Sequence, residues 1–575
     1  MSGKRARRLA ALAVALVAAG WAWNVAQRRP LPVSGAAPAA RPPVATGIVH
    51  VHTPASDGGG DAGEVIAAAR AAGLDFVAIS DHNNLDLKPL EGWHGELLVL
   101  VGTEISTQQG HVLGLGLERD PAFRFSGDAT DALDDVRLLG GRSFAAHPTS
   151  PRTELRWTGP TLPGDWGLEL LNGDTQWREA GFVRLARAGV VSLLNPREAL
   201  LGSLSPPSRA LLLWDRLLER RDVAGITGAD AHSRVPITRR FALRFPSYTA
   251  LFELARNHVL LERPLRPGDP DAGRRVVEAL AAGRSWIGVD ALAPSDGFGF
   301  WMEAPGERWE MGESLAPVPG LTAHLGGALP PGARLLLLRN GAPFATARGA
   351  LSVGISEPGV YRAQVQVEGF DVPWVISNPL YVFDAATQAR RRQRAAWPPP
   401  APAPQSAEPL DGFEGPSGFG PELDPSSWMH TPVLDPGAGA DGGGAARFSF
   451  RLGAPGPGRP YTWCALVERR ERDLSGREGL AFQLRGDGVY RVWVQVRDHN
   501  PASADDGLEW WFASVRSAEE WQEVVLPFDS LRSINPASDG QLDLDAVRAL
   551  VFVIDTGAAR PGTEGTLWID ELRVF

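Results

Sequence analysis

Short apolar runs alternate with helical stretches from about Gly47 to Gly288, and this alternation constrains the fold more than any other feature of the sequence. The runs have the length of strands and lie at 47–51, 76–80, 97–101, 143–146, 167–171, 190–194 and 224–227. Strands separated by helices, such as the one expected over 62–72, favour parallel β/α units. Seven or eight such units predict a barrel, in which side chains at the C-terminal ends of the strands form the functional site.

Histidines and carboxylates follow most of these predicted strands. Six of the eleven histidines belong to the series, together with two acidic residues: His50, His52, His82, Glu104, His111, His147, Asp230 and His232. Residues i and i+2 of a strand share a face, so the first two imidazoles can share one metal ion. Imidazole and carboxylate ligands suit Zn, Mn or Fe. We therefore predict a metal-dependent hydrolase with two or three divalent metal ions as cofactors.

The motifs around these residues are specific. They read His50-Val51-His52-Thr53, Ser56-Asp57-Gly58, Ser80-Asp81-His82, Gly102-Thr103-Glu104, Ala146-His147-Pro148 and Asp230-Ala231-His232. Together they resemble the polymerase-and-histidinol-phosphatase (PHP) family of metallohydrolases, and within it the carbaryl-hydrolase-like (CehA/McbA) subgroup. The resemblance covers roughly residues 46–290. It implies a distorted (β/α)7 barrel that holds two or three metal ions.

The resemblance also implies how the ligands divide among the ions. The first ion would be held by His50, His52, Glu104 and Asp230. Glu104 would bridge to a second ion, completed by His111 and His147. A third ion would be held by His82, His232 and Asp57. Many family members have histidine at the last of these positions, so the alternative is that Asp57 only caps a turn before a helix.

The implied chemistry is metal-assisted hydrolysis at phosphorus or at a carbonyl carbon. Asp57 or His232 would protonate the leaving group. Arg152 and Arg234 are candidates to clamp a small anionic substrate, with ordinary surface charge as the alternative. Asn172 ends a predicted strand and would either line the pocket or serve a turn. A phosphoester is the leading substrate class, and a carbamate, ester or amide is the alternative.

Two β-rich regions follow the predicted barrel. Residues 291–385 are predicted to form a small β-sandwich, residues 386–409 a Pro-rich linker, and residues 410–575 an all-β jelly-roll similar to carbohydrate-binding domains. The last region holds seven tryptophans, whose faces can stack on sugar rings. Trp510 and Trp511 are adjacent in a predicted strand, so only one of them can enter a single core. A glycan is therefore a predicted partner, and a surface glycan-binding protein with a non-catalytic barrel is the alternative to the hydrolase.

The N-terminus and the net charge bound the location and the partners. Basic residues precede an apolar run from Leu9 to about Ala26, which predicts a signal peptide or membrane anchor over residues 1–28, followed by a linker at 29–45. We expect an exported protein that is periplasmic, extracellular or anchored facing outward, with a membrane contact if the helix is not cleaved. The net charge of −10 argues against nucleic acid as a partner.

Overall fold

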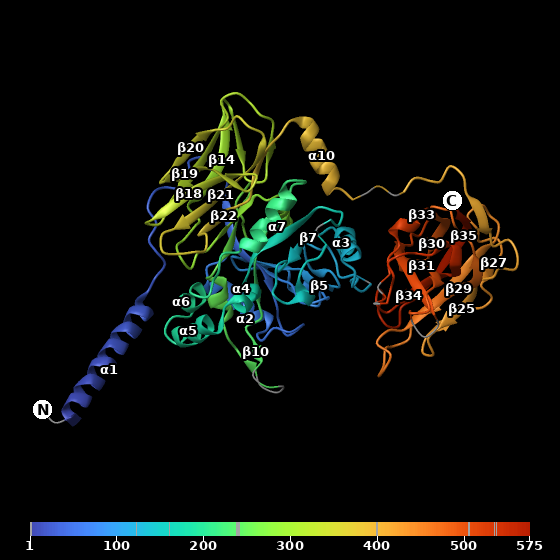
Figure 1. The fold of residues 1–575 in the computed structure, drawn as a ribbon, viewed down its shortest axis with the longest axis horizontal. Helices are drawn as coiled ribbons and strands as arrows, with labels where there is room; N and C mark the ends of the chain where they lie inside the picture. Colours follow the sequence, from blue (N-terminus) through green and yellow to red (C-terminus); the bar gives the residue numbers. More distant parts are fainter. Residues whose placement is uncertain are drawn as a thin grey trace. The chain divides into compact units, whose positions relative to one another are not determined.

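The computed structural model describes residues 3–575 except 122, 160, 237, 239–241, 398, 400, 504–506, 534 and 536. The chain forms two compact units. The first comprises Met1–Asp120 and Gly127–Trp397, and the second Pro121–Ser126 and Pro398–Phe575. Figure 1 shows the first unit mainly in blue to yellow and the second in orange to red.

The first unit is built on a mixed sheet that closes on itself. Its first strands are β1 (Val44–Val51), β2 (Phe76–Ile79), β3 (Gly92–His94), β4 (Leu97–Val101), β5 (Thr103–Thr107), β6 (Gly110–Leu115), β7 (Arg142–Ala146), β8 (Trp166–Asn172) and β9 (Gly225–Ala231). Parallel pairs join β4 to β2, β2 to β1, β1 to β9, β9 to β8 and β8 to β7. The pairs β5–β6 and β6–β7 are antiparallel. The parallel strands therefore end at one edge of the sheet, where the candidate site lies.

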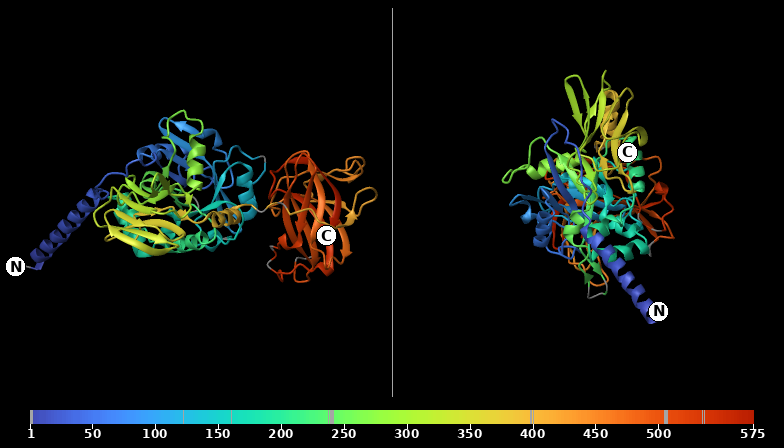
Figure 2. Two further views of the ribbon diagram at one scale, coloured as in Figure 1. Left: turned by 90° about the horizontal axis from the view of Figure 1, so that it is seen from above. Right: turned by 90° about the vertical axis from the view of Figure 1, so that its left-hand side faces the viewer.

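Helices cover this sheet and connect its strands (Figure 2). They are α2 (Ala62–Ala71), α3 (Ala129–Leu138), α4 (Gly173–Glu179), α5 (Phe182–Ser192), α6 (Pro196–Leu201), α7 (Ser208–Leu218), α8 (Tyr248–Phe252) and α9 (Ala272–Ala281). Asp61 begins α2 with a capping box, because its side chain accepts from the Glu64 amide while Glu64 accepts from the Asp61 amide. The apolar side of α9 enters the core beneath the sheet, with Val276 and Leu280 fully buried.

The predicted distorted (β/α)7 barrel is wrong. The chain is 37% strand and 20% helix. Strands β5 and β6 form a hairpin where the prediction requires a helix, and the turn between them uses Gly110 at φ +109°. Strands β12 (Arg256–Leu260) and β13 (Ser285–Gly288) add antiparallel pairs beside β1. Short apolar runs do not distinguish strands from buried helix, and the run predicted as a strand at 190–194 overlaps the end of α5.

The region predicted as a separate β-sandwich at 291–385 is part of the first unit. One sheet contains β15 (Glu307–Glu310), β14 (Phe298–Ala304), β17 (Thr322–Gly327) and β20 (Leu351–Gly354). The other strands continue the main sheet through the pair β13–β22: β16 (Ser314–Leu315), β18 (Ala333–Arg339), β19 (Ala342–Arg348), β21 (Gly359–Val367), β22 (Val375–Ser377) and β23 (Leu380–Val382). The Asn378 side chain accepts from the Gly225 amide at 2.7 Å and donates to its carbonyl at 2.8 Å, which ties this region to β9.

A short strand pair and a helix also belong to the first unit. Strands β10 (Val235–Pro236) and β11 (Ala242–Leu243) pair near the site. Helix α10 (Ala385–Ala395) occupies part of the predicted linker, and its buried Arg391 contacts Asp222 at 2.8 Å. Pro398 and Pro400 of that linker lie outside the described residues.

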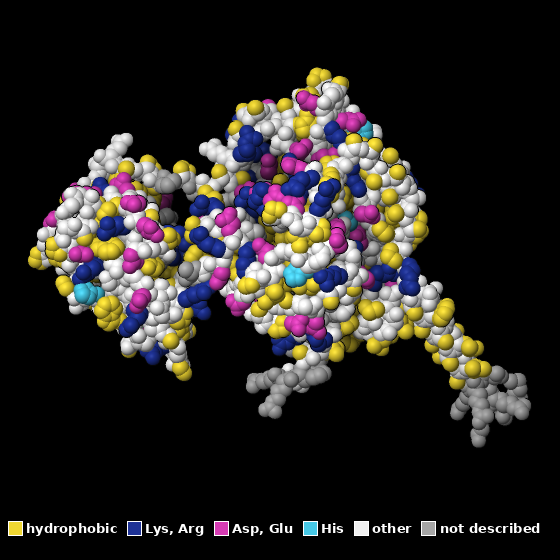
Figure 3. All heavy atoms as spheres, turned by 180° about the vertical axis from the view of Figure 1, so that it is seen from behind, with side chains coloured by type: hydrophobic (Ala, Val, Ile, Leu, Met, Phe, Trp, Pro, Cys, Tyr) yellow, Lys and Arg dark blue, Asp and Glu magenta, His cyan; other side chains and the backbone are white. Residues whose placement is uncertain are grey.

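Helix α1 (Gly3–Gln27) exposes apolar side chains such as Leu16 and Trp23 (Figure 3). Its C-terminal end packs against the unit, where Val25 is buried in a cluster with Ala188, Val191 and Ala199. Among the helices that the described residues form, none combines the length and the apolar character needed to cross a membrane.

The second unit confirms the predicted all-β sandwich at the C-terminus. One sheet contains β26 (Trp428–Met429), β28 (Ala445–Arg451), β35 (Glu564–Val574), β30 (Gly479–Gly486) and β33 (Gln522–Pro527), with β24 (Glu408–Asp411) and β27 (Leu434–Asp435) at its side. The other contains β25 (Gly420–Leu423), β29 (Trp463–Arg472), β34 (Val547–Asp555), β31 (Arg491–His499) and β32 (Leu508–Arg516). Trp511 is 7% exposed in the core between the sheets, while Trp510 is 43% exposed. The prediction that only one of the pair is buried is confirmed.

Candidate metal centre

Glu104 of β5 is a buried carboxylate surrounded by five histidines. One of its oxygens, Oε2, lies 3.0 Å from His50 Nε2, 3.2 Å from His52 Nε2 and 3.4 Å from His82 Nδ1. The other, Oε1, lies 2.7 Å from both His111 Nδ1 and His147 Nε2. The side chain of Glu104 is 1% exposed. A single acidic residue thus touches imidazoles from five separate positions of the sequence.

The backbone delivers these side chains through strained positions at the strand ends. His50, His147 and Asp230 have φ values of 66°, 31° and 47°, which are unfavourable for residues other than glycine. The register of β1 shifts between Ile48 and Val51 against β2 and between Val49 and Val51 against β9, so His50 occupies a bulge. Bulges re-aim side chains next to functional sites. His50 and His52 therefore converge through a bulge and not through regular strand alternation.

Two further acidic residues complete the cluster. Asp230 Oδ1 lies 3.5 Å from His50 Nε2 and 3.4 Å from His52 Nε2. Asp57 Oδ1 lies 3.2 Å from His232 Nε2 and 3.9 Å from His82 Nε2. In each of three groups the ligand atoms lie within 4.8 Å of one another: His50, His52, Glu104 and Asp230; His52, Asp57, His82 and His232; and His82, Glu104 and His111.

These groups largely match the predicted ligand sets. The four residues assigned to the first ion lie together. The set assigned to the third ion also lies together, and His52 joins it. The second set differs, because His82 and not His147 groups with Glu104 and His111. His147 nevertheless contacts the same Glu104 oxygen as His111.

The donor set fits divalent cations. His50 Nε2 and His52 Nε2 are buried and close to carboxylate oxygens, yet neither has a hydrogen bond of good geometry to any residue that the structure describes. Nitrogens in this position resemble ligands whose lone pairs point to a common centre. Although burial opposes charge on Glu104, the contact with His50 and hydrogen bonds from His111 hold the pKa of Glu104 well below its usual value. Burial lowers the pKa of His147, but contact with Glu104 raises it, to about 9 overall. The cluster thus requires positive charge, which protons or metal ions can supply.

Glu169 of β8 supports the cluster from behind. It contacts His50 Nδ1 at 2.6 Å and accepts from the His147 amide at 2.8 Å. Asn172 donates to Glu169 at 2.9 Å and to Asp230 at 3.2 Å, and its own oxygen caps α4. Asn172 therefore positions acidic residues and caps a helix. A histidine ligand commonly donates its second ring N–H to a carboxylate, and this contact orients the ring.

Sequence reasoning missed Glu169, although it quoted the strand that carries it. The available signal was a lone carboxylate in the apolar run Gly167-Leu168-Glu169-Leu170-Leu171, because charged residues are rarely buried without a partner. Asp81, of the motif Ser80-Asp81-His82, accepts from the amide and the hydroxyl of Thr53 at 2.8 and 2.7 Å, which fixes the turn after β1.

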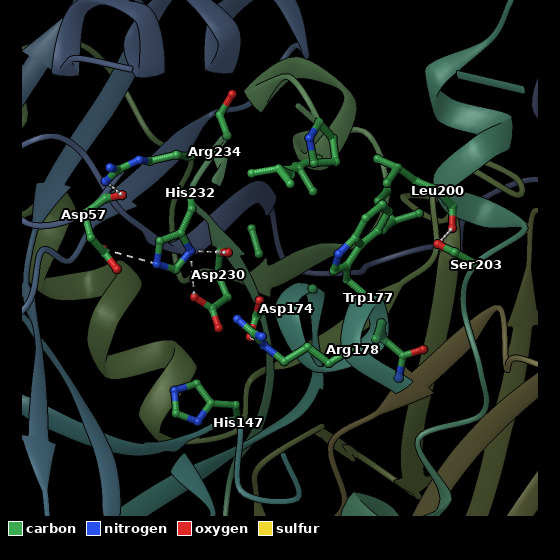
Figure 4. Close-up of a pocket in the computed structure, with 18 of the residues that line it drawn as sticks. Asp57, His147, Asp174, Trp177, Arg178, Leu200, Ser203, Asp230, His232 and Arg234 are labelled. Atoms are coloured by element: carbon green, nitrogen blue, oxygen red, sulfur yellow. Dashed lines mark hydrogen bonds and ion pairs between the residues drawn. The ribbon is translucent and has the colours of Figure 1, made fainter. Parts of the chain in front are cut away.

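A pocket of about 790 Å³ opens beside the cluster. Figure 4 shows Asp57, His232 and Asp230 on one side of it and Trp177 and Leu200 on the other. The predicted binding residues Arg152 and Arg234 line it, and Asn172 does not. Residues that the sequence analysis did not identify also line it: Asp174, Trp177, Arg178, Leu200, Ser203, Leu204, Phe245, Leu251 and Leu254.

Three arginines of the pocket contact neighbouring oxygen atoms. Arg152 pairs with Glu154 at 2.8 Å, and Arg178 pairs with Asp174. Arg234 donates to the Asp57 carbonyl at 3.3 Å. The side chains that sequence reasoning missed come from helices and loops between strands, where no motif marks them.

Asp57 and His232 differ as proton donors. Burial raises the pKa of Asp57, but the hydrogen bond and charge of His232 lower it to about 2 overall. Burial lowers the pKa of His232, but Asp57 and Asp230 raise it to about 9 overall. At neutral pH and without metal ions, these shifts favour a protonated His232 and an ionised Asp57.

Comparisons with known proteins do not assign the chain to a family. No family model matches it. A segment of 91 residues, 15% of the chain, is 34% identical to an uncharacterized protein of Methanocaldococcus jannaschii, and it covers about half (52%) of that protein's length.

Several of the similar solved structures are carbohydrate-binding modules. A family 11 module from Clostridium thermocellum is 20% identical over 29% of this chain and 95% of the module, with a TM-score of 0.24. A family 30 module from a cellulosomal cellulase of the same organism is 16% identical over 26% of this chain and 91% of the module, with a TM-score of 0.20.

Replacing Glu169 tests its support of the cluster. Glu169→Gln keeps the size of the side chain but removes the negative charge beside His50 Nδ1. We therefore expect a 10- to 100-fold loss of affinity for Zn²⁺, on the order typical for such contacts. Isothermal titration of the chelator-treated full chain measures this affinity. Glu96→Gln, at an exposed loop position, is the matched control and should bind as the wild type does. Unchanged affinity in Glu169→Gln would show that the contact does not serve metal binding.

Proposed function

We propose that this chain is a metal-dependent hydrolase. The observation that carries the proposal is the convergence of six histidines, Glu104, Asp230 and Asp57 in one cluster, most of whose members line one pocket. Buried polar atoms that only stabilise a fold are nearly always hydrogen-bonded. The buried Nε2 atoms of His50 and His52 have no such partner among the described residues, which favours a role as metal ligands. The motif resemblance to the PHP family supports the same proposal.

In this proposal the residues of the cluster hold the metal ions and donate a proton to the leaving group. His50, His52, Glu104 and Asp230 would hold one ion, and the Glu104 oxygen that faces His111 and His147 would extend to a second. His82, His232 and Asp57 would hold a third. When bound, such ions lower the pKa of water and polarise the oxygen of the acceptor group. If the third site is not filled, His232 carries the proton that a leaving group needs.

The pocket favours an anionic substrate with an apolar part. Arg152, Arg178 and Arg234 supply positive charge around the opening, which suits a phosphoester. Trp177 and Phe245 contact each other with ring centroids 6.0 Å apart and form part of an apolar wall. That wall also suits a neutral aryl carbamate or ester, which is the alternative within the hydrolase proposal.

Activity of the full chain with Mn²⁺ or Zn²⁺ tests this proposal. A panel of chromogenic phosphomonoesters, phosphodiesters and aryl carbamates separates the substrate classes. We expect His50→Ala to lose at least about a hundredfold in kcat/KM because it removes an ion ligand. His94→Ala is the control, since His94 lies outside the cluster and bonds to the Leu90 carbonyl. Wild-type turnover that His50→Ala retains would contradict the proposal.

A second candidate function is glycan binding by the C-terminal sandwich. Val492, Val494 and Val496 of β31 point into the core, so Trp493, Gln495 and Arg497 point to the opposite face of the sheet.

On the neighbouring strand β32, Trp510 and Phe512 share that face, because Trp511 and Ala513 are in the core. The register pairs Arg497 with Trp510 and Gln495 with Phe512. The guanidinium of Arg497 lies 4.1 Å from the centre of the Trp510 ring. Exposed aromatic side chains can stack on sugar rings, and Trp510 of this face is 43% exposed.

Screening the full chain on an array of plant, microbial and host glycans tests this candidate. We expect Trp510→Ala to weaken binding by roughly tenfold, equivalent to about 1.4 kcal/mol. Trp428→Ala is the matched control, because Trp428 is 48% exposed but belongs to the other sheet. Absence of binding across the array would reject the candidate without affecting the hydrolase proposal.

A further inference from the structure

Two acidic residues are buried side by side in the second unit, far in sequence from the histidine cluster. Asp498 of β31 and Glu509 of β32 are direct cross-strand partners. They are 2% and 1% exposed. They share the core-facing side of the sheet with Val496 and Trp511, since alternate residues of a strand point the same way. Side chains paired in this way stand about 5 Å apart at Cβ.

Each carboxylate has one oxygen that is held and one that is not. Asp498 Oδ2 accepts from the Asp543 amide at 2.8 Å, and Glu509 Oε2 accepts from the Asn500 side chain at 2.7 Å. Asp498 Oδ1 and Glu509 Oε1 are buried and have no hydrogen-bond partner among the residues that the structure describes. A buried carboxylate oxygen without a partner costs about 1–3 kcal/mol or more. Two of them on neighbouring strands need an explanation.

Protonation does not remove the charge of this pair at neutral pH. Burial and the charges of Glu509 and Asp543 raise the pKa of Asp498 to about 6. Burial also opposes the charge of Glu509, but the nearby polar groups of Ser538, Ser533 and Asn500 lower its pKa. Both pKa values lie below 7, which favours the ionised forms at neutral pH. Among the described residues, no lysine or arginine is one of the main causes of the pKa shift of either carboxylate.

The described groups named beside Glu509 carry oxygen atoms and no sulfur or imidazole. Ser533 and Ser538 hydroxyls and the Asn500 side chain lie beside Glu509. Oxygen-only sites that contain two carboxylates prefer hard cations, Ca²⁺ above all, over Zn²⁺.

We propose that Asp498 and Glu509 form the carboxylate core of a Ca²⁺ site in the C-terminal sandwich. The ion joins strands β31 and β32 to the segments that carry Asn500 and Asp543. It neutralises two charges that otherwise repel each other in a buried position. This site is separate from the proposed hydrolytic centre and does not depend on that function.

Calorimetric unfolding of the full chain, treated with chelator and then given Ca²⁺, tests the proposal. Ligand at a hundredfold excess over its Kd should raise the Tm of the C-terminal transition by about 5–10 °C. The variants Asp498→Asn and Glu509→Gln should lose this Ca²⁺-dependent shift. Without Ca²⁺ they should be at least as stable as the wild type, because each removes one of two repelling charges.

Ca²⁺ titration by calorimetry should find one site fewer per chain in Glu509→Gln than in the wild type, which separates this site from any Ca²⁺ held by the histidine cluster. Asp529→Asn, at an exposed position, is the control and should keep both responses. The proposal would be overturned if the wild-type Tm did not respond to Ca²⁺, which would mean that the pair shares a proton instead. It would also be overturned if the two variants kept the Tm response and the site number of the wild type.

Discussion

The contact of Glu104 with five histidines is the interaction on which the rest of the first unit depends. A carboxylate that is 1% exposed is stable only where positive charge or strong hydrogen bonds reach it. The five imidazoles come from strand ends that meet at one edge of the sheet. The bulge at His50 and the positive φ values at His147 and Asp230 are the cost of aiming these side chains at one point.

A second layer of contacts keeps that arrangement in place. Glu169 touches both His50 and the backbone of His147, and Asn172 links Glu169 to Asp230. These buried groups restrict the rings to one orientation, which a metal site requires. The pocket beside them is formed by helices and loops of the first unit, so substrate choice and metal binding depend on different parts of the chain.

The sequence predicted the residues that converge better than the fold that brings them together. Motifs such as Ser80-Asp81-His82 mark ligand types directly, and the structure brings all the predicted ligands into one cluster, although their roles remain a prediction. The (β/α)7 barrel failed because short apolar runs do not reveal strand direction, as the hairpin β5–β6 shows. Glu169 and Trp177 carry no motif, and only tertiary packing brings them to the site.

Metal analysis of the purified full chain tests the central claim most directly. The protein is loaded with Zn²⁺ or Mn²⁺, freed of unbound ions by gel filtration and analysed by inductively coupled plasma mass spectrometry. The account predicts two or three ions of that metal per chain, and a lower number when Glu104 is replaced by Gln. Fewer than about one ion per wild-type chain would contradict it and would leave glycan binding as the better explanation of this protein.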